Sequence, residues 1–255
     1  MKKGNKSIIY AVEGSVALVT LNRPEKRNAL NDELVGNLKE SLRKADSDKD
    51  VRVVVITGAG ADFCSGADLA SLQKISEASV EENLKDAQSL MELFTLIRSV
   101  SVPVVAAVRG RALAGGCGLA TACDLVLAAR SARFGYPEVK IGFVPAMVMA
   151  ILRRNVSEKR AFELISRGAM IDAEEAERIG LVNQVFDDDK FEAEVEAYVT
   201  GFENVSRSAV MLSKRLLYNM DGMTFDTALQ SGVDVNTIAR MTEDCQKGIA
   251  QFLKK

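Results

Sequence analysis

The chain has 255 residues, of which 47% are hydrophobic and 27% are charged, and its formal net charge at pH 7 is −2. This length and composition allow one large hydrophobic core or two, and the near-neutral charge gives no electrostatic basis for binding nucleic acid. The sequence contains no histidine. Catalytic pairs that need an imidazole base and metal sites with histidine ligands are therefore excluded, and carboxylates must carry any acid–base chemistry.

The N-terminal segment and the cysteines indicate a cytoplasmic protein. The first six residues are basic, but the apolar stretch after them is only as long as a strand and is followed by Glu13. This pattern supports neither a secretory signal nor a membrane span, so no membrane contact is expected. The four cysteines show no Cys-x-x-Cys spacing, which favours reduced thiols and no metal site.

The first sixty residues predict strands around one helix. Two apolar runs flank a turn at Glu13 and Gly14, and a later β-branched run is typical of a strand buried on both faces. Between them, Asn31 is a suitable cap for a helix whose leucines recur every four residues before the polar stop at Asp46. The expected strands are 8–12, 15–21 and 51–57.

After these elements the pattern becomes more helical. Leu84, Met91 and Ile97 lie on the apolar stripe of one expected helix. Asp172 with Glu175 resembles a capping box, and Ser157 is a suitable N-cap. The expected elements are a helix at 82–99, strands at 104–108 and 125–128, helices at 157–168 and 172–180, a strand at 181–186, and helices from about 191 to the C-terminus.

Two glycine-rich turns, at 57–69 and 110–120, are the main functional signal. Each follows an apolar run and opens a helix of small residues, so each leaves main-chain N–H groups without helical partners. Two such groups can bind one negative oxygen together. Glu138 follows on a Tyr-Pro-Glu turn. Either turn alone is compatible with a structural strand-to-helix connection, but the combination predicts an enzyme that stabilises an enolate and moves a proton.

Several short motifs occur in a fixed order along almost the whole chain. They are LNRP at 21–24, NALN at 28–31, GADL at 66–69, AGGCGLA at 114–120, FGYPEVKIG at 134–142, AEEAERIGLVNQV at 173–185 and TED at 242–244. In this combination the chain resembles the crotonase, or enoyl-CoA hydratase/isomerase, superfamily. The combination is specific to that superfamily, whereas each motif alone is not.

The resemblance implies an α/β fold, a crotonase-like spiral of β-β-α turns with a helical C-terminal trimerisation region. Residues 1–190 are expected to form the α/β core that holds the CoA and active site, and 191–255 the helical region. The resemblance further implies an acyl-CoA substrate and self-association as a homotrimer or a dimer of trimers. Coenzyme A is expected as part of the substrate, with no separate cofactor.

By position in the family motifs, three residues are expected to perform the reaction. The main-chain N–H groups of Ala67 and Gly115 would bind the thioester oxygen, and Glu138 would be the acid and base. Lys26 and Arg27 are expected to meet CoA phosphates, although they are equally compatible with a solvated surface pair. The expected substrate- and CoA-binding residues are Lys26, Arg27, Ala29, Gly66, Asp68, Leu69, Gly118 and Phe252, the last reaching a neighbouring subunit's ligand.

The chain departs from the family pattern at Gly118, where hydratases usually carry a second glutamate. Hydration needs a base for water and an acid for the α-carbon, whereas moving a proton between the α- and γ-carbons of an enoyl thioester needs one base. The single Glu138 therefore favours double-bond isomerisation and leaves hydration or dehydration open. Residues 143–149 replace a glycine-rich turn and predict a bulkier, apolar wall beside the site.

Other functions also fit parts of the sequence. A single glutamate fits a hydratase of the methylglutaconyl-CoA type, with a branched substrate, and the loss of the other glutamate fits a non-catalytic acyl-CoA-binding homologue. Tyr136 and Lys140 have the spacing found in short-chain NAD-dependent dehydrogenases. Pro137 disfavours the helix that such a pair requires, which makes this alternative remote.

Overall fold

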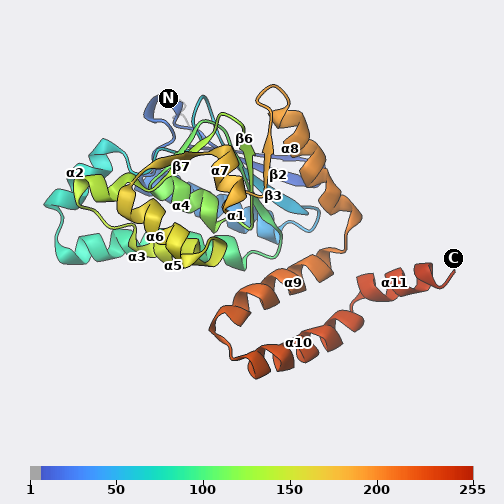
Figure 1. Ribbon diagram of the computed structural model, residues 1–255. Helices are drawn as coiled ribbons and strands as arrows, with labels where there is room; N and C mark the ends of the chain where they lie inside the picture. The colour runs from blue at the N-terminus through green and yellow to red at the C-terminus, as the bar shows by residue number, and fades with distance from the viewer. Residues whose placement is uncertain (1–6, 255) are drawn as a thin grey trace.

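The computed structural model describes residues 7–254, except for the side chain of Leu69 (Figure 1). The basic segment at 1–6 and Lys255 lie outside the described residues. The strands are β1 (Ile8–Glu13), β2 (Val16–Leu21), β3 (Val53–Gly58), β4 (Val104–Val108), β5 (Arg111–Leu113), β6 (Leu125–Ala129), β7 (Arg133–Gly135), β8 (Met170–Asp172) and β9 (Gln184–Phe186).

The helices alternate with these strands at first and then dominate the C-terminal third. The α-helices are α1 (Asp32–Ser47), α2 (Leu69–Glu77), α3 (Val80–Ser99), α4 (Gly115–Ala122), α5 (Ala146–Asn155), α6 (Glu158–Arg167), α7 (Ala173–Arg178), α8 (Phe191–Thr200), α9 (Arg207–Asn219), α10 (Phe225–Arg240) and α11 (Glu243–Phe252). The 3-10 helices are η1 (Pro24–Lys26), η2 (Pro137–Ile141), η3 (Gly201–Asn204) and η4 (Met220–Gly222).

The described strands form a long sheet in the order β1-β2-β3-β4-β6-β9 and a short sheet in the order β5-β7-β8. In the long sheet only β1 and β2 pair antiparallel, and the other neighbours are parallel. From β4 onward the chain places one strand in the long sheet and the next in the short sheet before it enters a helix, as in β4-β5-α4 and β6-β7-α5. This arrangement confirms the expected α/β spiral of β-β-α turns.

Both faces of the long sheet are buried. On one face, Leu34, Leu38 and Leu42 of α1 belong to a core that also contains buried residues of α3 and α4. On the other face, Phe191, Val195 and Val199 of α8 pack against β3, β4 and β6. The continuous β-branched run in β3 therefore has the two-sided burial that its composition predicts. Because α8 packs on the sheet, it belongs to the core of the protein. The expected boundary between an α/β core at 1–190 and a helical region at 191–255 remains a prediction.

The α3 helix differs from its prediction in start and in burial. Ser79 and Glu82 form a capping box, so the helix begins at Val80. The predicted apolar stripe is not buried at two of its positions, because Leu84 is 56% exposed and Met91 is 50% exposed. The buried residues of α3 lie in its last turns, at Leu93, Phe94 and Ile97.

Other local predictions shift by a few residues. The strand expected at 181–186 is shortened to β9, because the N–H groups of Leu181 and Val182 donate to the carbonyl of Ala176 and close the end of α7. Ser157 does occupy an N-cap position, but its side chain makes no capping hydrogen bond. The strands of the short sheet each have three residues, too few to show an alternating pattern.

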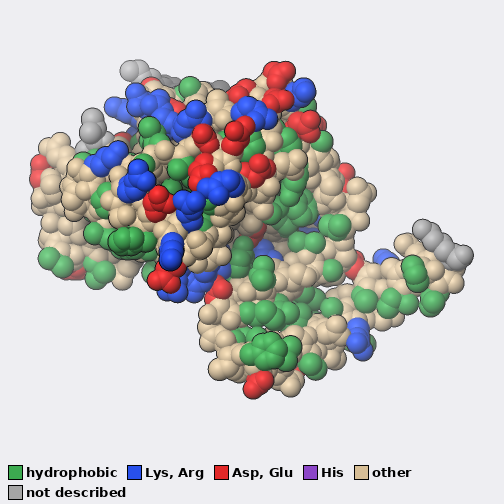
Figure 2. Space-filling view, in the orientation of Figure 1, with side chains coloured by type: hydrophobic (Ala, Val, Ile, Leu, Met, Phe, Trp, Pro, Cys, Tyr) green, Lys and Arg blue, Asp and Glu red, His purple; other side chains and the backbone are tan. Residues whose placement is uncertain are grey.

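The helices α9, α10 and α11 extend away from the sheet core, which confirms the helical C-terminal region (Figure 1). No residue of α10 or α11 that the structure describes is buried, although both helices carry large apolar side chains. These side chains gather along α10 and α11 in Figure 2. Within residues 7–254, no helix combines the length and the apolar character needed to cross a membrane.

Candidate active site

The two glycine-rich turns predicted from the sequence contact each other. Gly66 has φ +94°, and a Cβ atom at this position would lie 2.8 Å from the Cβ of Ala114 and 3.0 Å from the carbonyl oxygen of Leu113. The same Cβ would lie 3.5 Å from the nitrogen of Gly115. Glycine is required here both for the backbone conformation and for the close approach of the second turn.

Hydrogen bonds hold the two turns in this position. The N–H of Cys64 donates to the carbonyl of Arg111 at 3.0 Å, and the N–H of Leu113 donates to the carbonyl of Cys64 at 3.0 Å. The first turn of α4 also lies directly on Cys64, because a Cβ at Gly116 would be 2.2 Å from the Cys64 carbonyl oxygen. The start of α4 is therefore fixed against the residues that precede α2.

Two main-chain amides at this junction have no acceptor within residues 7–254. The neighbouring Leu30 N–H donates to the Gly66 carbonyl at 2.7 Å, whereas the Ala67 N–H makes no such bond. Gly115 is the first residue of α4, and the first main-chain hydrogen bond of that helix is donated by Gly118 to Ala114 at 2.9 Å. The Ala67 and Gly115 amides are thus donors without an acceptor in the described part of the chain, and they belong to two turns that contact each other.

Strand β7 leads into η2, which carries Glu138, and is joined to the second glycine turn. Leu113 of β5 is paired with Gly135 of β7, and the Ala114 N–H donates to the Gly135 carbonyl at 2.9 Å. The next residue, Tyr136, is fully buried, and its hydroxyl lies 2.8 Å from Oγ1 of Thr121 on α4. Both contacts tie the start of η2, and with it Glu138, to the helix that carries Gly115.

Glu138 has the environment of a proton-transfer group. Its Oε2 is buried and has no hydrogen-bond partner among the described residues. Burial raises the pKa of Glu138 above its ordinary value, and only a hydrogen bond from the residue's own main chain opposes the shift. A carboxyl group with a raised pKa and an unused oxygen is better suited than an ordinary glutamate to accept a proton and return it.

The helix face one turn beyond Gly115 is closed by apolar side chains. A Cβ at Gly118 would lie 2.5 Å from Cγ2 of Val148 and 3.4 Å from Cζ of Phe94. Val148 on α5 therefore forms the apolar wall that the sequence predicts beside the site. Phe143 and Val144, from the same predicted wall, are instead exposed.

Gly118→Glu is expected to lower the free energy of unfolding by about 2 kcal/mol or more, because the new side chain both overlaps Val148 and buries a carboxylate. The double variant Gly118→Glu/Val148→Ala should recover part of this loss. Urea unfolding measures both effects. The control is Gly36→Glu in α1, where nothing lies within 4 Å of a Cβ, and equal losses at the two glycines would contradict the prediction.

Asp68 and Arg23 brace the first turn. The Asp68 carboxylate caps α2 by accepting from Ser71 N–H at 2.8 Å, and it pairs with Nη2 of Arg23 at 2.8 Å. Arg23 also donates to the carbonyl of Ala29. Burial works against ionisation of Asp68, but the hydrogen bonds from Arg23 and Ser71 outweigh it and lower its pKa. Asp68 is therefore an ionised bracing group and not a proton donor.

The other predicted binding residues differ in burial and in the elements that carry them. Ala29 is buried, whereas the side chains of Lys26 and Arg27 are exposed beside it, and the Arg27 carbonyl accepts from Ser65 N–H at 3.0 Å. Leu69 begins α2. Phe252 ends α11 and is 79% exposed, and α11 lies away from the sheet core at the C-terminal end of the chain (Figure 1).

The sequence alone indicates no role for Arg23 or Thr121. Arg23 lies inside the LNRP motif, and this position could have indicated that it has a role at the site. Thr121 carries no such signal, because its role depends on its contact with Tyr136 across the fold. The buried hydroxyl of Tyr136 is engaged by Thr121, which removes it from a dehydrogenase-type pair with the exposed Lys140.

Comparisons with known proteins show the family and the fold of the chain. Residues 11–255 match the family model described as enoyl-CoA hydratase/isomerase. A Thermus thermophilus protein named as an enoyl-CoA hydratase is 41% identical over 248 residues, which cover 97% of this chain and 98% of that protein. The crotonyl-CoA hydratase of Syntrophomonas wolfei is 34% identical, with 98% and 96% covered. The crystal structure of an enoyl-CoA hydratase from Mycobacterium smegmatis has a TM-score of 0.92 at 31% identity, covering 97% of this chain and 96% of that one.

Proposed function

The chain belongs to the enoyl-CoA hydratase/isomerase family and is an enzyme of this type, and from this premise we propose that it acts on an enoyl-CoA thioester through an enolate. The amides of Ala67 and Gly115 bind the thioester oxygen, and Glu138 moves the proton. Two observations support the proposal: the Ala67 and Gly115 amides, in two turns that contact each other, have no acceptor among the described residues, and the buried Oε2 of Glu138 has no partner there. Coenzyme A enters as part of the substrate, and no separate cofactor is proposed.

The proposed reaction is migration of a double bond. The Glu138 carboxylate removes a proton from the α-carbon of a 3-enoyl thioester, and the electron pair is delocalised onto the thioester oxygen. The two amides stabilise this negative charge where it develops. The carboxylic acid formed at Glu138 then returns its proton to the γ-carbon, which leaves a 2-enoyl thioester. A raised pKa assists both steps, because the group must act as base and then as acid.

Isomerisation is preferred because the site offers one carboxylate. Val148 and Phe94 occupy the space beside Gly118, so a second acid has no place there without repacking. Asp68 is held ionised by Arg23. One group suffices to move a proton between two carbons, whereas adding water across a double bond uses a base and an acid.

Hydration is the second candidate, and the names of relatives favour it. These include the crotonyl-CoA hydratase already described and the 2,3-dehydroadipyl-CoA hydratase of Escherichia coli, which is 34% identical over 249 residues. In this case Glu138 would activate the water and then deliver the proton. A branched substrate of the methylglutaconyl-CoA type belongs to the same candidate.

A substrate panel tests the two reactions together. The purified protein is incubated in D₂O with straight and branched 2-enoyl- and 3-enoyl-CoA esters, and NMR follows deuterium at the α- and γ-carbons while mass spectrometry follows addition of water. Bond migration with γ-carbon labelling supports isomerisation, and a hydroxyacyl product supports hydration. Thioester binding without exchange or product across the panel would overturn the proposed reaction.

Lys26 and Arg27 are proposed to bind the phosphates of coenzyme A. The proposal is supported by their exposed side chains and by the hydrogen bond that joins the Arg27 carbonyl to the turn before Ala67. Ala29, Gly66 and Leu69 complete the proposed binding surface on that side of the junction. Phe252 is proposed to reach the ligand of a neighbouring subunit, since it ends α11, a helix that extends away from the sheet core of its own chain (Figure 1).

Self-association through α10 is proposed, as a homotrimer or a dimer of trimers. Phe225, Leu229 and Val233 are exposed on this helix and border a hollow of about 690 Å³. An apolar surface of this kind is costly in water and favours burial between subunits.

Leu229→Glu/Val233→Glu is expected to shift the protein from an oligomer to a monomer, because it places two charges on the apolar face of α10. Light scattering after size-exclusion chromatography measures the mass. Val80→Glu, at an exposed apolar position on α3, is the control and should keep the mass of the unmodified protein. A monomeric unmodified protein, or an unchanged mass in the double variant, would refute this assembly.

A further inference from the structure

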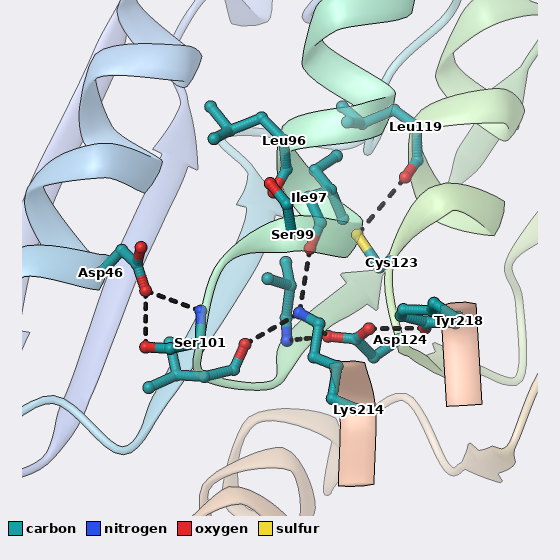
Figure 3. Close-up of polar contacts among 12 residues, drawn as sticks. Asp46, Leu96, Ile97, Ser99, Ser101, Leu119, Cys123, Asp124, Lys214 and Tyr218 are labelled. Atoms are coloured by element: carbon teal, nitrogen blue, oxygen red, sulfur yellow. Dashed lines mark hydrogen bonds and ion pairs between the residues drawn. The ribbon is translucent and has the colours of Figure 1, made fainter. Parts of the chain in front are cut away.

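A buried polar network joins the end of α4 to α9 (Figure 3). Asp124 lies just beyond α4, and its Oδ2 accepts from Nζ of Lys214 at 2.7 Å and from the N–H of Val104 at 2.6 Å. Its Oδ1 accepts from the hydroxyl of Tyr218 at 2.6 Å. Lys214 and Tyr218 are both on α9, so two residues of the C-terminal region hold one carboxylate of the core.

Lys214 is fully used within this network. Its ammonium group also donates to the carbonyls of Ile97 and Val102, each at 3.0 Å, so three acceptors surround its three donors. Ile97 is in the last turns of α3 and Val102 precedes β4. The loop between them is held by Asp46, which accepts from both the N–H and the hydroxyl of Ser101 at 2.6 Å (Figure 3). The ammonium group thus joins α3, β4 and the end of α4.

The buried contact that attaches α9 to the core is made by a charged side chain, where an apolar side chain would be expected. Lys214 is the buried residue of α9, with 9% of its surface exposed. A buried ion pair contributes little net stability compared with apolar residues of similar size, but it does specify geometry when its partners are complete. Burial and the Asp124 charge raise the pKa of Tyr218, so its hydroxyl remains the donor to Asp124.

The C-terminal end of α9 and the following η4 also contact side chains of α3 and α5. Arg98 of α3 stacks on the Tyr218 ring at 3.9 Å and pairs with Asp221 at 3.0 Å. Arg154 of α5 pairs with the same carboxylate at 2.6 Å. Because α5 also carries Val148, the helices that pack around α4 are all connected to the segment from α9 to η4.

We propose that Lys214 and Tyr218 are positioning residues for the reaction: by holding Asp124 they fix α4, and with it the Gly115 amide, relative to the core and to the C-terminal helices. The inference rests on the proposed function, since it concerns the amide assigned to the thioester oxygen. Neither side chain touches the substrate. The link makes the placement of α9 to α11 part of what orients the oxygen-binding site.

Tyr218→Phe is the main test, because it removes one hydrogen bond and keeps the ring under Arg98. Its kcat is expected to fall between about threefold and thirtyfold, with KM and oligomer mass unchanged. Lys214→Met should have a larger effect, since it leaves Asp124 buried without its cation. Tyr198→Phe on α8 is the matched control and should retain the kcat of the unmodified protein.

Hydrogen exchange of the amides at 114–122, followed by mass spectrometry on the intact protein, gives a readout that does not need turnover. Faster exchange in Tyr218→Phe, of the same threefold to thirtyfold order, is expected at this segment and not in Tyr198→Phe. If the unmodified protein turns over no enoyl-CoA, the proposed function fails. The exchange result then decides by itself whether Lys214 and Tyr218 hold α4 in place through Asp124. Unchanged exchange at 114–122 in both Tyr218→Phe and Lys214→Met would overturn this inference.

Discussion

Glu138→Gln is expected to lower the rate of proton exchange at the α- and γ-carbons of enoyl-CoA by about 10² to 10⁴-fold, the range that a positioned acid–base group contributes. Glutamine has nearly the same shape, so the contacts of η2 and the binding of the thioester should be retained. NMR in D₂O measures exchange, and titration with a non-reactive acyl-CoA measures binding. Loss of binding together with exchange would point to a role in substrate contact.

The matched control for this substitution is Glu194→Gln, at an exposed position of α8. It removes the same charge from the chain without touching the site. Exchange at the rate of the unmodified protein is expected in this control. Equal rates in Glu138→Gln and Glu194→Gln would contradict the assignment of Glu138 as the acid and base.

The pH dependence follows from the burial of Glu138. Its pKa is raised, so the carboxylate form that starts the reaction is populated only at higher pH than for an ordinary glutamate. The rate of α-proton removal should therefore rise with pH through this raised pKa. The same shift means that the folded state binds this proton more tightly than the unfolded state does. The charged form thus costs stability above the raised pKa, and Glu138→Gln should be at least as stable as the unmodified protein at neutral pH.

Gly66→Ala is expected to lower kcat by about 10² to 10³-fold, the loss typical of removing one donor from an oxyanion site. The new Cβ would lie 2.8 Å from the Cβ of Ala114 and 3.5 Å from the nitrogen of Gly115, so the two turns must separate. Separation moves the Ala67 and Gly115 amides away from a common oxygen. Because that oxygen carries its charge in the transition state, the affinity for the ground-state thioester should fall much less than kcat.

Gly14→Ala separates backbone strain from loss of the site. Gly14 also has a positive φ, +58°, but it lies in the turn between β1 and β2, where a Cβ would make only an ordinary contact with Oε1 of Glu203 at 3.7 Å. Both alanines should lower the thermal midpoint, whereas only Gly66→Ala should lower kcat in protein that is still folded by circular dichroism. Normal kcat in folded Gly66→Ala would remove the two-amide site from the mechanism.

Several features of the fold were predictable because their signals are local. Asn31 caps α1 by accepting from the Leu34 N–H at 3.0 Å, and the leucines of that helix are buried, as their spacing predicts. The β-branched run of β3 is buried on both faces. The exposure of Leu84 and Met91 on α3 was not predictable. Both residues fit the helical spacing of an apolar stripe, but no other element within residues 7–254 covers them.

The sequence by itself determined which chemistry was possible and where its groups lie along the chain: the absence of histidine, the order of the two glycine turns, and Glu138 on the Tyr-Pro-Glu turn after them. Only the tertiary structure decided that Gly66 lies against Gly115, that Val148 covers Gly118, and that Lys214 reaches Asp124. Each of these contacts joins residues that lie between 30 and 90 positions apart. A local pattern records the period and the capping of an element, whereas such contacts depend on how whole elements pack, and packing is a property of the complete fold.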